Sequence, residues 1–208
     1  MLTSFCPSSF CEEDYAVTKY LAEFINALSN LAYGTYISAR CNLSSILIEQ
    51  VYLAFYYPKR RHGQLDLMSA SLVIVGIASF LFHATLRLPA QFSDDISMLF
   101  LAGALLRTLY CAKQSPAHFT LITTSIYATV SVMSALYIQS GNLLVHVAMF
   151  VGMLMLIWPR TLYLIAHRQD NQGMLARKFG MAVAYLALAF LVWNIDLRMC
   201  EELRSLRK

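Results

Sequence analysis

The chain has 208 residues, of which 58% are hydrophobic and only 13% charged, and its formal net charge is +4. Soluble domains usually carry about 45–50% apolar and about 25% charged residues, so this composition favours a bilayer as the solvent. The basic residues form short clusters between apolar stretches and no single basic face, which argues against nucleic-acid binding. Without a repeat or a low-complexity linker, one membrane domain over residues 1–208 is the simplest organisation.

Six apolar stretches approach or reach the roughly 20 residues that a helix needs to cross the hydrocarbon. We place these spans at residues 21–39, 67–86, 96–110, 119–138, 143–166 and 179–197. They are predicted to be helical because lipid offers no partner for an unpaired backbone amide. The predicted fold is an all-α, polytopic transmembrane helix bundle.

Segment 34–50 interrupts the first span. Without it, residues 21–33 and 51–57 would join into one continuous apolar helix that ends at Pro58. We therefore interpret 34–50 as an insertion, and if it is genuine we expect an interfacial amphipathic stretch.

The loops between spans indicate the orientation. If the spans alternate, the basic clusters fall on one side, which the positive-inside rule makes cytosolic: Lys59, Arg60, Arg61, Arg107, Lys113, Arg168, Arg177 and Lys178. The acidic N-terminal segment 1–20 is then lumenal, and the basic segment 198–208 departs from the rule. Cys11 and Cys200 both fall on the oxidising side, where either a disulfide between them or free thiols are possible.

Ser79, His83 and Asp94 form the most informative polar group. Ser79 and His83 are four residues apart, so they share one face of a helix, and Asp94 follows after a short connection. Such a group can be a serine nucleophile with its base or half of a zinc site. The structural alternatives are a serine bonded to the preceding turn and, for Asp94 and Asp95, residues at a helix N-terminus.

Two further clusters lie near the chain ends. Glu12, Glu13, Asp14 and Glu23 are either oxygen ligands for a hard cation such as calcium or an acidic, solvated flank. The segment from Trp193 to Asp196 suits an interfacial position but indicates no chemistry by itself. His146, alone in its span, is expected to be a packing residue between helices.

Taken in this order, the clusters resemble those of the alkaline ceramidase and phytoceramidase family. The resemblance covers most of the chain and is carried by four motifs: Cys11-Glu12-Glu13-Asp14-Tyr15; Ala22-Glu23-Phe24 with Asn26, Ser29 and Asn30; Ser79, Phe82-His83 and Thr85-Leu86 with Asp94; and Trp193-Asn194-Ile195-Asp196 with Cys200-Glu201.

The resemblance implies a zinc-dependent hydrolase in the endoplasmic reticulum or Golgi membrane that cleaves ceramide or phytoceramide to a long-chain base and a fatty acid. His83 looks like the first zinc ligand, Asp94 like the acid that orients or deprotonates the attacking water, and Ser79 like the group that stabilises the oxyanion. The family's calcium site would fall on Glu12, Asp14 and Glu23, with the backbone of Phe10 as a contributor.

Two departures from the family pattern matter. Ser9-Phe10 replaces an Asp-Trp pair and Asp14 replaces an Asn, so a calcium site would change its geometry. The family pattern ends in an HxxxH motif on a seventh helix, and no HxxxH occurs in this sequence. The resemblance therefore predicts a chain truncated before its last helix, with one zinc ligand of three. The alternative is a non-catalytic, lipid-binding or receptor-like member of the same superfamily.

Overall fold

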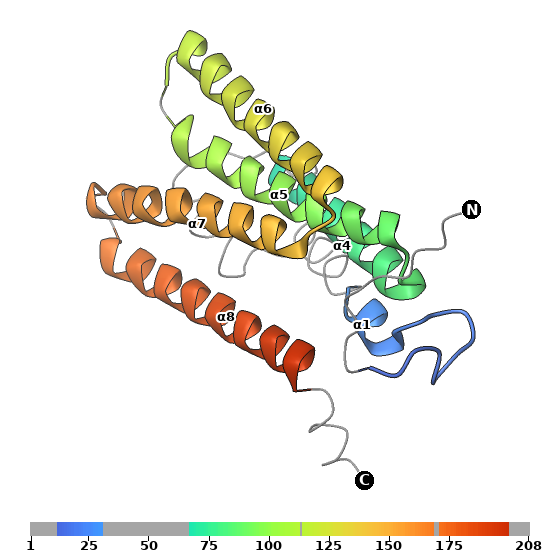
Figure 1. Ribbon diagram of the computed structural model, residues 1–208. Coiled ribbons are helices and arrows are strands. Elements are labelled where there is room, and N and C mark those ends of the chain that lie inside the picture. Colours follow the sequence, from blue (N-terminus) through green and yellow to red (C-terminus); the bar gives the residue numbers. More distant parts are fainter. Residues whose placement is uncertain (1–11, 31–66, 113, 169–170, 200–208) are drawn as a thin grey trace.

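A computed structural model describes residues 12–30, 67–112, 114–168 and 171–199, and these ranges fold mainly into helices, with short connections between successive helices from residue 67 onward (Figure 1). In chain order the helices are α1 (Phe24–Ser29), α4 (Leu67–Thr85), α5 (Leu88–Tyr110), α6 (Pro116–Ser140), α7 (Leu143–Ala166) and α8 (Gln172–Arg198). Four of them, α4, α6, α7 and α8, are long and apolar enough to cross a membrane. The prediction of an all-α polytopic membrane protein is confirmed.

Helix α5 lies at the centre of the described bundle and carries three charged residues, Asp94, Asp95 and Arg107. It packs against α4, α6 and α7 (Figure 1). Neighbouring helices thus cover a helix whose charged residues would be costly to expose to lipid. The first expected span, 21–39, is described only as far as residue 30, and segment 34–50 lies outside the described residues, so the count of six spans stays a prediction.

The outer helices turn apolar side chains outward. Large hydrophobic residues of α8 are more than half exposed, among them Tyr185, Leu188, Phe190, Leu191 and Val192. Such an apolar exterior is expected of a helix that faces lipid. Among the described helices, α8 contacts α7.

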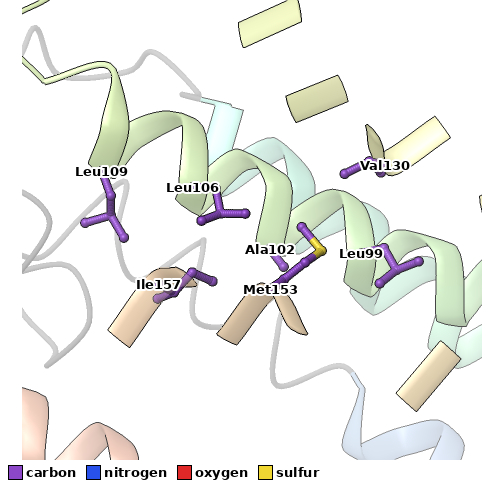
Figure 2. Close-up of a cluster of buried hydrophobic side chains, with 7 residues drawn as sticks. All are labelled: Leu99, Ala102, Leu106, Leu109, Val130, Met153 and Ile157. Carbon is purple, nitrogen blue, oxygen red and sulfur yellow. The ribbon is translucent and has the colours of Figure 1, made fainter. Parts of the chain in front are cut away.

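The apolar core lies along the second half of α5 (Figure 2). Leu99, Ala102, Leu106 and Leu109 of α5 pack against one residue of α6 and two of α7, namely Val130, Met153 and Ile157. The α5 positions recur at helical spacing, so they line one face of that helix. Gly103, next to these residues, allows α6 to approach α5 closely, because a Cβ at this position would lie 3.1 Å from Cγ2 of Val130.

Local sequence signals explain where the helices begin and end. Prolines stand in the first turns of α5 and α6. The N–H that proline lacks would have no partner within the helix at these positions, so no hydrogen bond is lost. Gly141, at φ 61°, ends α6 in the left-handed conformation that glycine adopts without steric cost. The expected start of the third span at residue 96 was wrong: α5 begins at Leu88, because Pro89 initiates the helix well before its sequence becomes strongly apolar.

The N-terminal segment is tied to the end of α4. The backbone N–H groups of Ala22 and Glu23 donate to the carbonyl oxygens of Ala84 and His83, at 3.1 and 3.0 Å. The last carbonyls of a helix have no partner within it, so this pairing satisfies two of them. It also fixes Glu23 beside the last turn of α4.

Candidate active site

Ser79, His83 and Asp94 come together between α4 and α5, as the sequence predicts. The Ser79 hydroxyl lies close to the Asp94 carboxylate, and Asp94 interacts electrostatically with His83. Ser79 and His83 lie on successive turns of α4. The structure thus gathers a hydroxyl, an imidazole and a carboxylate at one place.

The short reversal between the two helices produces this arrangement. Only Leu86 and Arg87 separate α4 from α5, and Leu86 adopts a left-handed φ of 48°. Ser79 lies six residues before the end of α4 (85 − 79), and Asp94 lies six residues after the start of α5 (94 − 88). At about 1.5 Å per residue both lie about 9 Å from the turn, and therefore at the same level.

Asp94 and Asp95 are not helix N-terminal residues. Because α5 begins at Leu88, both carboxylates lie in its second turn, and the first turn carries no acidic residue. Attraction to the helix dipole is concentrated in the first turn, so that alternative does not explain why the two acids are there. Both are buried, each about 9% exposed.

Glu23 reaches the site from the N-terminal segment. Its Oε2 atom lies 2.6 Å from Nδ1 of His83 and accepts a 3.0 Å hydrogen bond from the Asn26 amide. The Glu23 side chain is fully buried, and its other oxygen, Oε1, has no hydrogen-bond partner among the described residues. A buried carboxylate in this position favours the His83 tautomer protonated at Nδ1.

The acidic residues of the N-terminal segment lie in different environments in the structure. Both carboxylate oxygens of Glu12 accept backbone N–H groups of α1, from Ile25 at 2.6 Å and from Asn26 at 3.0 Å. Asp14 lies on the exposed surface, and Phe10 lies outside the described residues. Within the described part of the chain, no group of three His, Cys, Asp or Glu residues is arranged to hold a metal ion.

A second buried polar cluster joins three helices. Asp95 of α5 accepts a hydrogen bond from the Tyr137 hydroxyl of α6, and its Oδ1 lies 3.8 Å from Nε2 of His146 on α7. The expectation that His146 packs between helices is confirmed, since its ring lies against Tyr137 and Phe150. Sequence reasoning missed Tyr137, because a tyrosine near the end of a span ordinarily suits an interface.

The remaining sequence clusters add less to the site. In α8, the Asn194 amide donates to the backbone carbonyl of Phe190 at 2.8 Å, and Trp193 packs beside Phe190. Cys11 and Cys200 lie outside the described residues, so their proposed disulfide stays a prediction.

These features define a polytopic helical membrane protein with a partly buried histidine–carboxylate–serine site toward one end of its bundle. Residues 5–208 match the ceramidase family, and the chain belongs to that family. Membership places it in a class of hydrolases that act on the amide bond of ceramide.

Individual relatives agree with the family match. The chain is 27% identical to alkaline ceramidase 3 of Mus musculus over 96% of its own length and 69% of the relative. It is 24% identical to an alkaline ceramidase of Saccharomyces cerevisiae, over 92% of this chain and 62% of the relative. The chain is 25% identical to an alkaline ceramidase of Arabidopsis thaliana, over 92% of this chain and 69% of the relative. The chain thus spans about two thirds of the length of these relatives.

Proposed function

We propose that this protein is a zinc-dependent hydrolase that cleaves the amide bond of ceramide or phytoceramide, releasing a long-chain base and a fatty acid. The observation that carries the proposal is the convergence of Ser79, His83 and Asp94 between α4 and α5. Amide hydrolysis needs a base for water, an acid for the leaving nitrogen and a donor for the oxyanion. This group of side chains contains all three functions.

The residues present fit one zinc ligand. A zinc-bound histidine usually donates its other ring N–H to a carboxylate or carbonyl group, which fixes the ring's orientation. The Glu23 carboxylate occupies that position at Nδ1 of His83, leaving Nε2 as the nitrogen for the metal. Catalytic zinc takes about three protein ligands; in the family pattern an HxxxH motif provides the other two, and this sequence contains no such motif. A bound zinc ion would polarise the substrate carbonyl and acidify water.

Asp94 is positioned to move the proton. Its carboxylate would take a proton from the attacking water as the new C–O bond forms, and pass it to the amide nitrogen as the C–N bond breaks. Ser79 lies beside Asp94 at the same level of the site, and its hydroxyl would donate to the oxyanion when that charge develops. On cleavage the nitrogen leaves as the amine of the long-chain base and the carbonyl carbon becomes the fatty acid carboxyl group, whose proton passes to the amine to give carboxylate and ammonium.

The depth of the site suits a lipid amide. Ceramide places its two chains in the hydrocarbon and its amide near the headgroups, and the hydrocarbon is about 30 Å thick. Ser79 and Asp94 lie about two turns from the end of their helices. A lipid that enters between helices would therefore bring its amide to the level of these side chains.

Calcium is proposed as a second, structural ion near α1. The buried Oε1 of Glu23 has no hydrogen-bond partner among the described residues, and calcium prefers such carboxylate oxygens. Glu12 lies near Glu23, because both acids accept hydrogen bonds from Asn26. Glu23 and Glu12 would be ligands, with Asp14 and the Phe10 backbone completing the set as the resemblance implies.

The site end of the bundle is proposed to be lumenal. Arg107, Arg168 and Arg177 lie at or near the opposite ends of α5, α7 and α8, and basic residues concentrate on the cytosolic side. The resemblance implies the endoplasmic reticulum or Golgi membrane. A glycosylation acceptor added before residue 12 should be modified in cells, whereas cytosolic labelling there would reverse the orientation.

The single metal-binding histidine favours a second candidate, a lipid-binding or receptor-like protein without turnover. Within the described ranges no three-residue metal group exists, and one ligand does not hold zinc tightly.

The deciding experiment expresses the 208-residue chain and its Asp94→Asn variant in cells that lack ceramidase activity. Membranes receive ceramide and phytoceramide with a labelled acyl chain, and released fatty acid is measured. Release by the parent chain, lost in the variant, supports the hydrolase. Equal saturable ceramide binding by both proteins without release supports the non-catalytic candidate.

A further inference from the structure

We propose that the buried contact between Asp95 and Tyr137 is a positioning device, which fixes the rotation of α5 and thereby keeps Asp94 turned toward Ser79 and His83. Its catalytic consequence rests on the hydrolase function proposed above. The geometric claim, that this contact sets the orientation of α5, stands independently of turnover.

The two acids of α5 face different neighbours. Consecutive residues of a helix point about 100° apart around its axis. Asp94 is directed at α4, where it meets Ser79, whereas Asp95 meets the Tyr137 hydroxyl of α6 and lies 3.8 Å from the His146 ring of α7. Any rotation of α5 that moved one carboxylate would move the other.

Apolar packing is sparse at this level of α5. The larger core cluster begins at Leu99 and continues toward the C-terminal end of the helix (Figure 2). The buried residues of the first half of α5 are polar, namely Gln91, Asp94, Asp95 and Ser97, while Ala90 and Phe92 make apolar contacts from partly buried positions. Polar contacts, which are directional, therefore contribute much of the orientation of this half.

The contact is well placed for this role. Asp95, Tyr137 and His146 are 9%, 1% and 4% exposed, so little water competes for their hydrogen bonds. Phe92, one turn before Asp95, packs edge-on against the Tyr137 ring with centroids 5.2 Å apart. Tyr137 thus contacts α5 through both its hydroxyl and its ring.

The chain offers a matched pair of variants. Tyr127 lies on the same helix as Tyr137 and also packs against a phenylalanine of α5, Phe100, with centroids 5.3 Å apart. Its hydroxyl is buried but has no hydrogen-bond partner among the described residues. Tyr137→Phe removes the oxygen that bonds Asp95, whereas Tyr127→Phe removes a comparable oxygen without that bond.

The first measurement compares ceramide hydrolysis by the folded variants. Tyr137→Phe should lower kcat by about 10- to 100-fold, the cost of misplacing a catalytic group by about 1 Å, with KM unchanged. Tyr127→Phe should retain the kcat of the parent. If Tyr137→Phe lowers only the yield or thermal stability of the protein, while kcat per folded molecule stays at the parent value, the positioning role is wrong.

The second measurement needs no turnover. In a chain whose five native cysteines are replaced by alanine, Ser79→Cys and Asp94→Cys are joined with a short thiol cross-linker. Adding Tyr137→Phe should slow cross-linking severalfold, and Tyr127→Phe should not. Equal rates in the two backgrounds overturn the inference. If the parent chain releases no fatty acid, the hydrolase proposal fails, and these rates alone decide the positioning role.

Discussion

Nδ1 of His83 lies 2.6 Å from Oε2 of Glu23, although 60 residues separate them in the chain. Backbone pairing creates this contact, because the Glu23 amide donates to the carbonyl of His83 itself. The same segment leads directly into α1, which packs against α4. The Glu23 carboxylate therefore contacts both α1 and the proposed zinc ligand His83. A change in the structure of α1 is expected to change the position of the His83 ring.

Replacing Glu23 should change the protonation pattern of the His83 ring. In the parent the carboxylate favours a proton on Nδ1, and Glu23→Leu removes that preference. The ¹⁵N chemical shifts of the labelled ring, recorded in detergent micelles, distinguish the two tautomers. Glu13→Leu, at an exposed position, is the control. An unchanged His83 tautomer in Glu23→Leu would show that the carboxylate does not orient the ring.

The same contact predicts weaker metal binding. Loss of a carboxylate that orients a metal-binding histidine typically costs about 10- to 100-fold in affinity. Glu23→Gln should therefore lower the weak zinc affinity that a single histidine ligand gives, measured by equilibrium dialysis of the purified chain, while Glu13→Gln leaves it unchanged. Identical affinities in the two variants would contradict the assignment of His83 as a ligand held by Glu23.

Ser79 and Asp94 should differ in how much activity they contribute. Asp94→Asn keeps the shape but removes proton transfer, so kcat should fall by about 100- to 10,000-fold. Ser79→Ala removes one hydroxyl donor, and a loss of up to about 1,000-fold is expected. Fatty acid release per folded molecule is the measurement, and Ser134→Ala on α6, whose hydroxyl bonds its own helix backbone, is the control. Full activity in Asp94→Asn would refute the proposed mechanism.

Much of the fold could be predicted from hydropathy. Residues 143–166 are both the predicted fifth span and the observed α7, and α4 ends one residue before its predicted limit. Length and apolar composition suffice here because the hydrocarbon thickness sets both. The start of α5 was missed because Gln91, Ser93, Asp94 and Asp95 lower the local hydropathy although the helix already runs through them. Neighbouring helices shield most of those polar residues from lipid, and hydropathy does not report this shielding.

The site was predictable where its residues are neighbours on a helix or across a short turn. Ser79, His83 and Asp94 meet for both reasons. The contact of Glu23 with His83 was not predictable from spacing, because it depends on how a segment 60 residues away closes the end of α4. Tyr137 was missed for a similar reason, since its partner Asp95 lies 42 residues earlier in the chain.

The Glu12 carboxylate should control the start of α1. It accepts the N–H groups of Ile25 and Asn26, and a six-residue helix has few other bonds to hold it. Loss of a side-chain cap costs about 1 kcal/mol, so Glu12→Ala should speed hydrogen exchange at these two amides by about fivefold. Glu13→Ala should leave both rates unchanged. Unaltered exchange in Glu12→Ala would mean that packing on α4 holds α1 without the cap.

The close approach of α5 and α6 at Gly103 should limit the size of this residue. A Cβ there would lie 3.1 Å from Cγ2 of Val130 and 3.6 Å from Cγ2 of Ile126. Overpacking of this kind costs about 1–3 kcal/mol, partly offset because alanine is favoured over glycine in helices by about 1 kcal/mol. Gly103→Ala should therefore lower the unfolding free energy, measured by denaturant titration in micelles, by about 1 kcal/mol.

Gly180→Ala is the matched control, because no heavy atom lies within 4 Å of the added Cβ on α8. This variant should gain the helix preference without any clash, so its unfolding free energy should equal or exceed that of the parent. The clash at Gly103 also predicts coupling with Val130: the double variant Gly103→Ala/Val130→Ala should lose less stability than the sum of the two single changes, because each relieves the other's defect. Additive losses, or a stabilised Gly103→Ala, would place the tightest contact between α5 and α6 somewhere other than Gly103.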